Sequence, residues 1–187
     1  MNHHQRFSLK KLKNTLIFST FLVSLIPFNL YSAKALEFQW NPTDGYKRLR
    51  YYQKNNQKNF RNKIFLFFTP RDRKTGLMSL NIKIPKNFIS SLKPKNVILC
   101  KANLGGFTSK TKCLKDIQSD IILDKESNKL EIYPISPLPS DKDVYAVVFK
   151  INNPKRSGLY QFHSFGKSSG PIPVSSYIGS WTINIDP

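Results

Sequence analysis

The sequence predicts an all-β protein, a single antiparallel β-sandwich of the immunoglobulin-like type that follows an N-terminal signal peptide. Apolar and polar residues alternate at the period of strands, and no long segment keeps the spacing of a helix. Turn residues separate these strand-like runs at intervals of about a dozen positions. The first residues of the chain carry the three regions of an export signal.

The export signal consists of a basic start, an apolar run over residues 16–30 and the small residues Ala33 and Ala35, so cleavage is expected before Leu36. An uncleaved membrane anchor is the alternative, but it would need about 20 apolar residues, and Pro27 interrupts this run. We therefore expect an extracytoplasmic protein, located in the periplasm, in the outer envelope or outside the cell.

The chain is therefore expected to consist of three segments. Residues 1–35 are the expected signal peptide, residues 36–62 a basic and aromatic N-terminal strand or arm, and residues 63–187 the β-sandwich domain. Cleavage leaves a chain of ordinary length for one domain with one core.

The sequence contains eight strand-like runs, and their regular spacing is typical of a sandwich or a barrel. A tight hairpin turn is expected at residues 125–128, an extended proline segment at 134–139 and one short helical turn near 87–92. The strands are expected at residues 63–69, 80–84, 97–102, 121–124, 129–133, 144–152, 159–165 and 177–185.

Alternation also predicts which side chains face the core. Tyr160 and Phe162 share one strand face, so His163 should point outward. In the last strand, Trp181, Ile183 and Ile185 share a face and are expected to pack inside.

Cys100 and Cys113 are the only cysteines of the chain, and in an oxidising compartment this pair favours one disulfide. Two buried free thiols are the alternative. A zinc site is not expected, because these cysteines and His163 fall short of four ligands. We predict no metal and no cofactor.

No motif predicts an enzyme. His163 is the only base expected to titrate near neutrality after cleavage, and its outward position suggests an ordinary surface histidine. No serine lies in a G-x-S-x-G pattern. Asp120, Asp124 and Glu126 lack the glycine turn of a calcium loop.

Positive charge is concentrated in one half of the expected mature chain. Residues 46–112 contain 17 Lys and Arg against the single acid Asp72, whereas residues 113–187 contain 8 bases and 8 acids. Such asymmetry favours contact with an anionic surface. Composition bias is the alternative, because 23 lysines against 7 arginines is what AT-rich coding produces.

A tentative basic face is expected in the N-terminal arm, where aromatic residues alternate with cations. Outside the cytoplasm, its partners would be an acidic polysaccharide, lipopolysaccharide or an anionic membrane surface, and no nucleic acid is expected. The residues assigned to this face are Lys47, Arg48, Arg50, Lys54, Arg61 and Lys63.

The order of several segments resembles a known family. NPKRSGLYQF at residues 153–162 and YIGSWTINI at residues 177–185 follow the segments KIFLFFT, LNIKIP, VILCKAN and DKESNKLEIYPISPLP. In this order they resemble the cyanobacterial secreted family catalogued as domain of unknown function 2808, over residues 63–185. The resemblance implies a secreted β-sandwich and supplies no biochemical activity.

Two functions from different classes are consistent with the sequence. The first is a non-enzymatic envelope protein that binds an anionic surface component through its basic half. The second is a structural or interaction subunit of the envelope, whose sandwich edges pair with other chains and whose charge serves solubility. The sequence makes no prediction of the oligomeric state.

Overall fold

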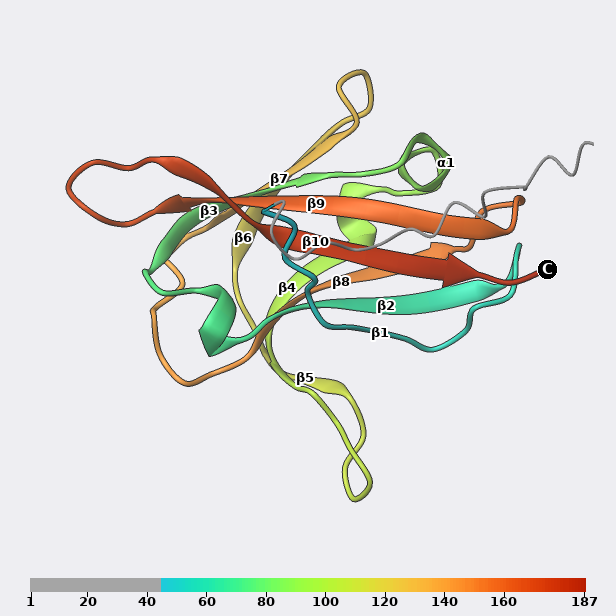
Figure 1. Cartoon of the computed structure of the whole chain (residues 1–187), viewed down its shortest axis with the longest axis horizontal. Helices are drawn as coiled ribbons and strands as arrows, with labels where there is room; N and C mark the ends of the chain where they lie inside the picture. Colours follow the sequence, from blue (N-terminus) through green and yellow to red (C-terminus); the bar gives the residue numbers. More distant parts are fainter. Residues whose placement is uncertain (1–44) are drawn as a thin grey trace, which may run out of the picture. The chain divides into compact units, whose positions relative to one another are not determined.

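The computed structural model describes residues 45–187, so the expected signal peptide lies outside the described residues. Two antiparallel sheets of five strands each pack face to face (Figure 1). The predicted antiparallel sandwich is therefore confirmed. None of the helices within residues 45–187 is long and apolar enough to cross a membrane.

The chain passes several times between the two sheets, as expected of an immunoglobulin-like sandwich. The first sheet contains, in spatial order, β1 (Tyr51–Gln53), β2 (Arg61–Phe68), β8 (Tyr145–Asn152), β4 (Val97–Asn103) and β5 (Lys112–Asp116). The second sheet contains β10 (Ser175–Ile185), β9 (Gly158–Ser168), β3 (Leu77–Lys83), β7 (Lys129–Pro134) and β6 (Ser119–Asp124). The helical segments are α1 (Lys86–Ile89) and the 3₁₀ turns η2 (Pro70–Asp72) and η3 (Pro94–Asn96).

All eight predicted strands are present, and the predicted helical turn is α1. Of the two further strands, β1 lies in the segment predicted as an N-terminal strand or arm. Strand β5 was not predicted, because its residues are mostly polar and exposed. The predicted hairpin turn joins β6 to β7, where the Asp124 carboxylate accepts the backbone N–H groups of Glu126 and Ser127. The proline segment runs beside β3, where Leu138 exchanges two backbone hydrogen bonds with Leu77.

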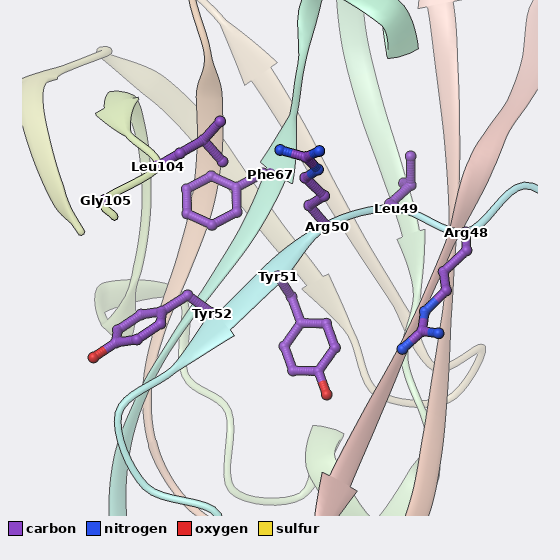
Figure 2. A pocket seen from close by; sticks show the side chains of 8 residues that line it. All are labelled: Arg48, Leu49, Arg50, Tyr51, Tyr52, Phe67, Leu104 and Gly105. Carbon is purple, nitrogen blue, oxygen red and sulfur yellow. The ribbon is translucent and has the colours of Figure 1, made fainter. Parts of the chain in front are cut away.

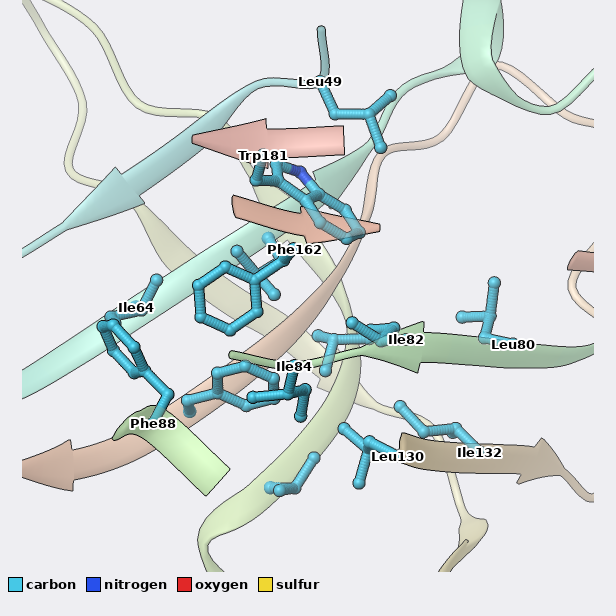
Figure 3. Packing of buried hydrophobic residues seen from close by; sticks show 14 of the residues in the cluster. Leu49, Ile64, Leu80, Ile82, Ile84, Phe88, Leu130, Ile132, Phe162 and Trp181 are labelled. Atoms are coloured by element: carbon cyan, nitrogen blue, oxygen red, sulfur yellow. The ribbon is translucent and has the colours of Figure 1, made fainter. Parts of the chain in front are cut away.

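The core lies between the sheets and is rich in aromatic rings (Figure 3). Phe68 meets Trp181 edge to face with ring centroids 5.2 Å apart, and Phe88 of α1 meets Phe162 at 5.0 Å. Helix α1 thus packs its phenylalanine into one end of the space between the sheets. Tyr160 and the three predicted residues of β10 also point inward, so the predicted faces of β9 and β10 are confirmed.

The segment just before β1 connects both sheets along one side of the sandwich. The N–H of Leu49 donates to the Ser180 carbonyl at 2.8 Å, and the N–H of Ser180 donates to the Lys47 carbonyl at 2.7 Å. The carbonyl of Arg50 then accepts from the Phe67 N–H in the first sheet and from the Trp181 indole in the second. This crossing fixes the direction in which the neighbouring arginine side chains point.

A glycine permits this crossing. Gly179 has a φ of +156°, and a Cβ at this position would lie 2.7 Å from both the Leu49 side chain and the Lys47 carbonyl. Only glycine allows β10 and the crossing segment to approach so closely.

Candidate functional site

Most of the predicted basic residues lie on one surface, formed by the outer face of the first sheet and the adjoining crossing segment, where Arg48 pairs with Ser180 of β10. Leu49 is buried against the core, and Arg48 and Arg50 on either side of it are exposed. In β2, Ile64, Leu66 and Phe68 point to the core, so alternation places the residues between them on the outer face. We call this surface the basic face, and its predicted members are Arg48, Arg50, Lys54, Arg61 and Lys63.

Three lysines lie side by side across this face. Lys63 is the register partner of Lys150 in β8, and the backbone N–H of Lys54 donates to the Lys63 carbonyl at 3.1 Å. Like charges in neighbouring positions of a sheet repel one another. Lys150 was not among the predicted residues, because it lies in the charge-balanced half of the sequence and only the strand register brings it here.

Apolar and aromatic residues fill the centre of the basic face. Phe65 and Phe67 are each 2% exposed and belong to a second buried cluster, separate from the core between the sheets. The ring of Tyr52 lies 6.0 Å from that of Phe65, and the Lys63 ammonium lies 4.9 Å above the same ring. The cations therefore lie around a buried apolar cluster, of which Tyr52, 44% exposed, reaches the surface.

Two adjoining hollows indent the sandwich at the end of the basic face that holds the arginines. The first has a volume of about 490 Å³ and is lined by residues 48–52 together with Phe67, Leu104 and Gly105. In Figure 2, Arg50 extends beside Phe67 and Leu104, while Arg48 lies farther along the segment. The second, of about 510 Å³, shares Arg48, Arg50 and Leu104 with the first and adds Lys47 and η2.

The cations of the basic face have no acidic partner within residues 45–187. The ion pairs there are Lys47–Asp72, Arg73–Asp141 and Lys101–Asp143. Of the six predicted residues, only Lys47 is paired, with its ammonium 2.8 Å from the Asp72 carboxylate. Lys47 therefore sits at the margin of the basic face with its charge compensated.

Several other cations of the basic half lie elsewhere. Lys83 of β3 alternates with the buried residues Ile82 and Ile84, so it lies on the outer face of the second sheet beside its register partner Lys129. The boundary at residue 112, which separates the basic part of the sequence from the charge-balanced part, therefore does not coincide with the boundary of the basic face.

Cys100 and Cys113 form a disulfide between β4 and β5, as predicted. Together with Asp116 they make a compact group of sulfur and carboxylate atoms. Both sulfurs are bonded to each other, so this group offers no thiolate to a metal ion.

His163 is less exposed than its outward position predicts. Its Nδ1 lies 2.8 Å from the Ser180 hydroxyl, which also lies 2.6 Å from the Tyr177 hydroxyl. Burial and the nearby Lys83 ammonium lower the pKa of His163. Ser180 is fully buried, so this serine–histidine pair is not presented to a substrate.

A third hollow, of about 570 Å³, lies near α1 and is lined by amide and hydroxyl side chains together with Lys155 and Arg156. It adjoins the end of the basic face that holds Arg61, because Asn152, which lines the hollow, is the register partner of Arg61. Neither this hollow nor the two arginine hollows was predicted, since each joins segments far apart in the sequence.

A family model described as "Protein of unknown function (DUF2808)" matches residues 38–185. The chain belongs to the DUF2808 family. The match begins earlier than the predicted resemblance, at residue 38 rather than 63, so the segment that carries the arginines is part of the family domain. The comparison with curated protein sequences gives no match.

The solved structures that resemble this DUF2808 protein share little sequence with it. A bacterial hydrophobin, BslA, is 12% identical with a TM-score of 0.46, covering 74% of this chain and 97% of that one. The collagen-binding domain of a Staphylococcus aureus adhesin is also 12% identical, with a TM-score of 0.40 and coverage of 73% and 97%. MyfA, the major subunit of Myf fimbriae from Yersinia enterocolitica, is 10% identical with a TM-score of 0.33 and coverage of 74% and 98%.

Proposed function

We propose that this DUF2808 protein is a non-enzymatic module of the cell envelope that binds an anionic surface component through the basic face. The observation that carries the proposal is the gathering of Arg48, Arg50, Lys54 and Lys63 on one face without an acidic partner among the described residues. The disulfide supports an oxidising, extracytoplasmic location.

The charge arrangement favours an external counter-anion. The neighbouring ammonium groups of Lys54, Lys63 and Lys150 repel one another. An acidic polysaccharide or the phosphates of lipopolysaccharide would reduce this repulsion. Arginine adds forked hydrogen-bond donors that match carboxylate, sulfate and phosphate groups.

The structure also favours recognition over catalysis. The only histidine in residues 45–187 is tied to a buried serine, and the two arginine hollows contain one carboxylate, Asp72, which is already paired with Lys47. These residues supply no accessible acid–base pair.

Retention on immobilised dextran sulfate at increasing salt tests the proposal. In the test variant, Arg48, Arg50, Lys54 and Lys63 are all replaced by glutamate. We expect the wild type to elute at a salt concentration several times higher than this variant, because screening weakens contacts between exposed charges.

The matched control reverses four exposed lysines on the second sheet and its hairpin turn, Lys83, Lys125, Lys129 and Lys167. This control changes the net charge by the same amount, and we expect it to retain most of the binding. Equal losses in both variants would contradict the proposal and leave composition bias as the explanation of the charge.

A structural subunit is the second candidate function, and the outer edges of β5 and β6, which no further strand of residues 45–187 covers, favour it. Each strand is the last of its sheet, and Leu114 and Ile122 are 55% and 52% exposed there. Such edges can pair with another chain. If this function is the correct one, replacing Ile122 with lysine will abolish a self-association that sedimentation detects in the wild type, while dextran sulfate retention in both proteins will be weak.

A further inference from the structure

The loop between β4 and β5, residues 104–111, presents an unusual apolar side chain. Phe107 has a relative exposure of 112%, so its ring makes almost no contact with the protein. Figure 1 shows the hairpin of β4 and β5 projecting away from the two sheets. One exposed apolar side chain alone does not indicate a partner, so the inference depends on how the loop is held and which charges lie near it.

This loop is held in place at its base. The disulfide joins the two strands below it, the Thr111 hydroxyl donates to the Leu104 carbonyl at 2.8 Å, and the N–H of Gly106 donates to the Ser109 carbonyl at 2.8 Å. Gly105 has a φ of +72°, and a Cβ there would lie 2.5 Å from the Thr111 hydroxyl. The phenylalanine is therefore presented by an ordered loop.

Cations lie on the loop and on the strand that follows it. Lys110, Lys112 and Lys115 are exposed and lie on the loop or on β5. On the other side, Leu104 and Gly105 line the hollow that also contains Arg48 and Arg50. The loop thus combines an apolar tip with cations on the loop itself, on β5 and in the hollow at its base.

We propose that Phe107 inserts into the surface of an anionic lipid layer while the surrounding cations bind its phosphate groups. This inference rests on the proposed function and specifies its ligand, because it requires acyl chains beneath the anionic groups. Aromatic rings settle at the boundary between headgroups and acyl chains, and each nearby Lys or Arg adds attraction to anionic lipid. Phospholipid and the lipid part of lipopolysaccharide share this chemistry.

Vesicle flotation tests the inference with the exported protein, purified from the periplasm of an expressing bacterium. Vesicles of phosphatidylglycerol and phosphatidylcholine should float the wild type, whereas phosphatidylcholine alone should not. Phe107→Ser should weaken the partition coefficient on the anionic vesicles about tenfold, because its apolar contact is lost. The matched control is Ile172→Ser, which removes an apolar side chain that is 78% exposed in the β9–β10 hairpin, and it should bind like the wild type.

A second variant reports insertion directly. Phe107→Trp should keep vesicle binding, and lipids brominated on the upper acyl chain should quench its fluorescence more strongly than they quench the wild type. Quenching equal to that of the wild type would overturn insertion at this position.

Vesicle flotation and dextran sulfate retention together distinguish this inference from the proposed function. If Phe107→Ser loses vesicle binding but keeps dextran sulfate retention, the inference is supported. If Phe107→Ser floats like the wild type, the inference is overturned while the basic face stands. Loss of both activities would overturn lipid insertion and make Phe107 part of the polyanion site. Failure of the wild type to bind either kind of vesicle would also overturn lipid insertion. A protein would then be the partner to test for this loop. Lipid sources are separated by repeating the flotation with vesicles that contain lipopolysaccharide.

Discussion

At the scale of single residues, a buried arginine fixes the connection that leads into β8. Arg73 is 2% exposed, lies 4.4 Å above the Tyr145 ring and donates to the carbonyls of Pro139 and Asp143. Asp141 completes the arrangement: burial raises its pKa, but hydrogen bonds from Tyr145, the Asp143 N–H and Arg73 together lower it. Burial, followed by the hydrogen bond to Asp141, raises the pKa of Tyr145 to about 12.

Replacing Arg73 with methionine tests this arrangement. Methionine keeps most of the volume but removes the donor to the partly buried Pro139 and Asp143 carbonyls and the ion pair to Asp141. We therefore expect the free energy of unfolding to fall by about 2 kcal/mol. Urea denaturation measures this change. The control Arg71→Met, at an exposed position nearby, should stay within about 0.5 kcal/mol of the wild type. Equal losses in the two variants would contradict a specific role for Arg73.

His163 predicts a pH dependence of stability. Its pKa is lowered in the folded protein, mainly by burial and then by Lys83, so the unfolded chain binds the proton more readily. The stability that neutral His163 contributes is present above its unfolded pKa of about 6.5 and is lost as the pH falls through and below that value. The melting temperature of His163→Gln should therefore fall less between pH 7.5 and pH 5.5 than that of the wild type. A larger fall in the melting temperature of the variant would contradict the lowered pKa of His163.

At the scale of elements, the sequence patterns identified the strands with apolar residues, including the edge strands β6 and β10, but they missed β5 and left β1 as a strand or an arm. Strand β2 reads as a continuous apolar run because it is buried on both faces. Strands β1 and β5 have mixed polar sequences, and they are strands because they pair with β2 and β4, a tertiary interaction that periodicity does not reveal.

The disulfide should stabilise the β4–β5 hairpin by restricting the unfolded chain. Closing a loop of this length contributes about 3 kcal/mol. Reduction should therefore lower the melting temperature of the wild type, and thiol labelling of the unreduced, denatured protein should detect no free cysteine.

The paired variant Cys100→Ala/Cys113→Ala is the control for this prediction. It should melt at the same temperature with and without reductant, close to the reduced wild type. If the melting temperature of the wild type also stays the same when reductant is added, the disulfide contributes nothing to stability.

At the scale of the whole molecule, the charge pattern of the sequence indicated a basic surface and only partly its position. Arg48, Arg50, Lys54, Arg61 and Lys63 were assigned to one face because they lie within one short basic stretch of the sequence. The position of Lys150 depends on the register of β2 with β8, and the arginine hollows depend on Leu104 and Gly105 from a distant loop. Such long-range pairings follow from the fold, so a single sequence could not supply them.

The central claim is that an anionic ligand binds the outer face of the first sheet. The most direct test is to titrate the isotope-labelled, exported protein with a dextran sulfate oligosaccharide and follow the backbone amide signals by NMR. We predict that the shifts concentrate in residues 47–54, in β2 and around Leu104, and that they diminish as salt is added. Shifts that concentrate on the outer face of the second sheet, around Lys83 and Lys129, would contradict the claim.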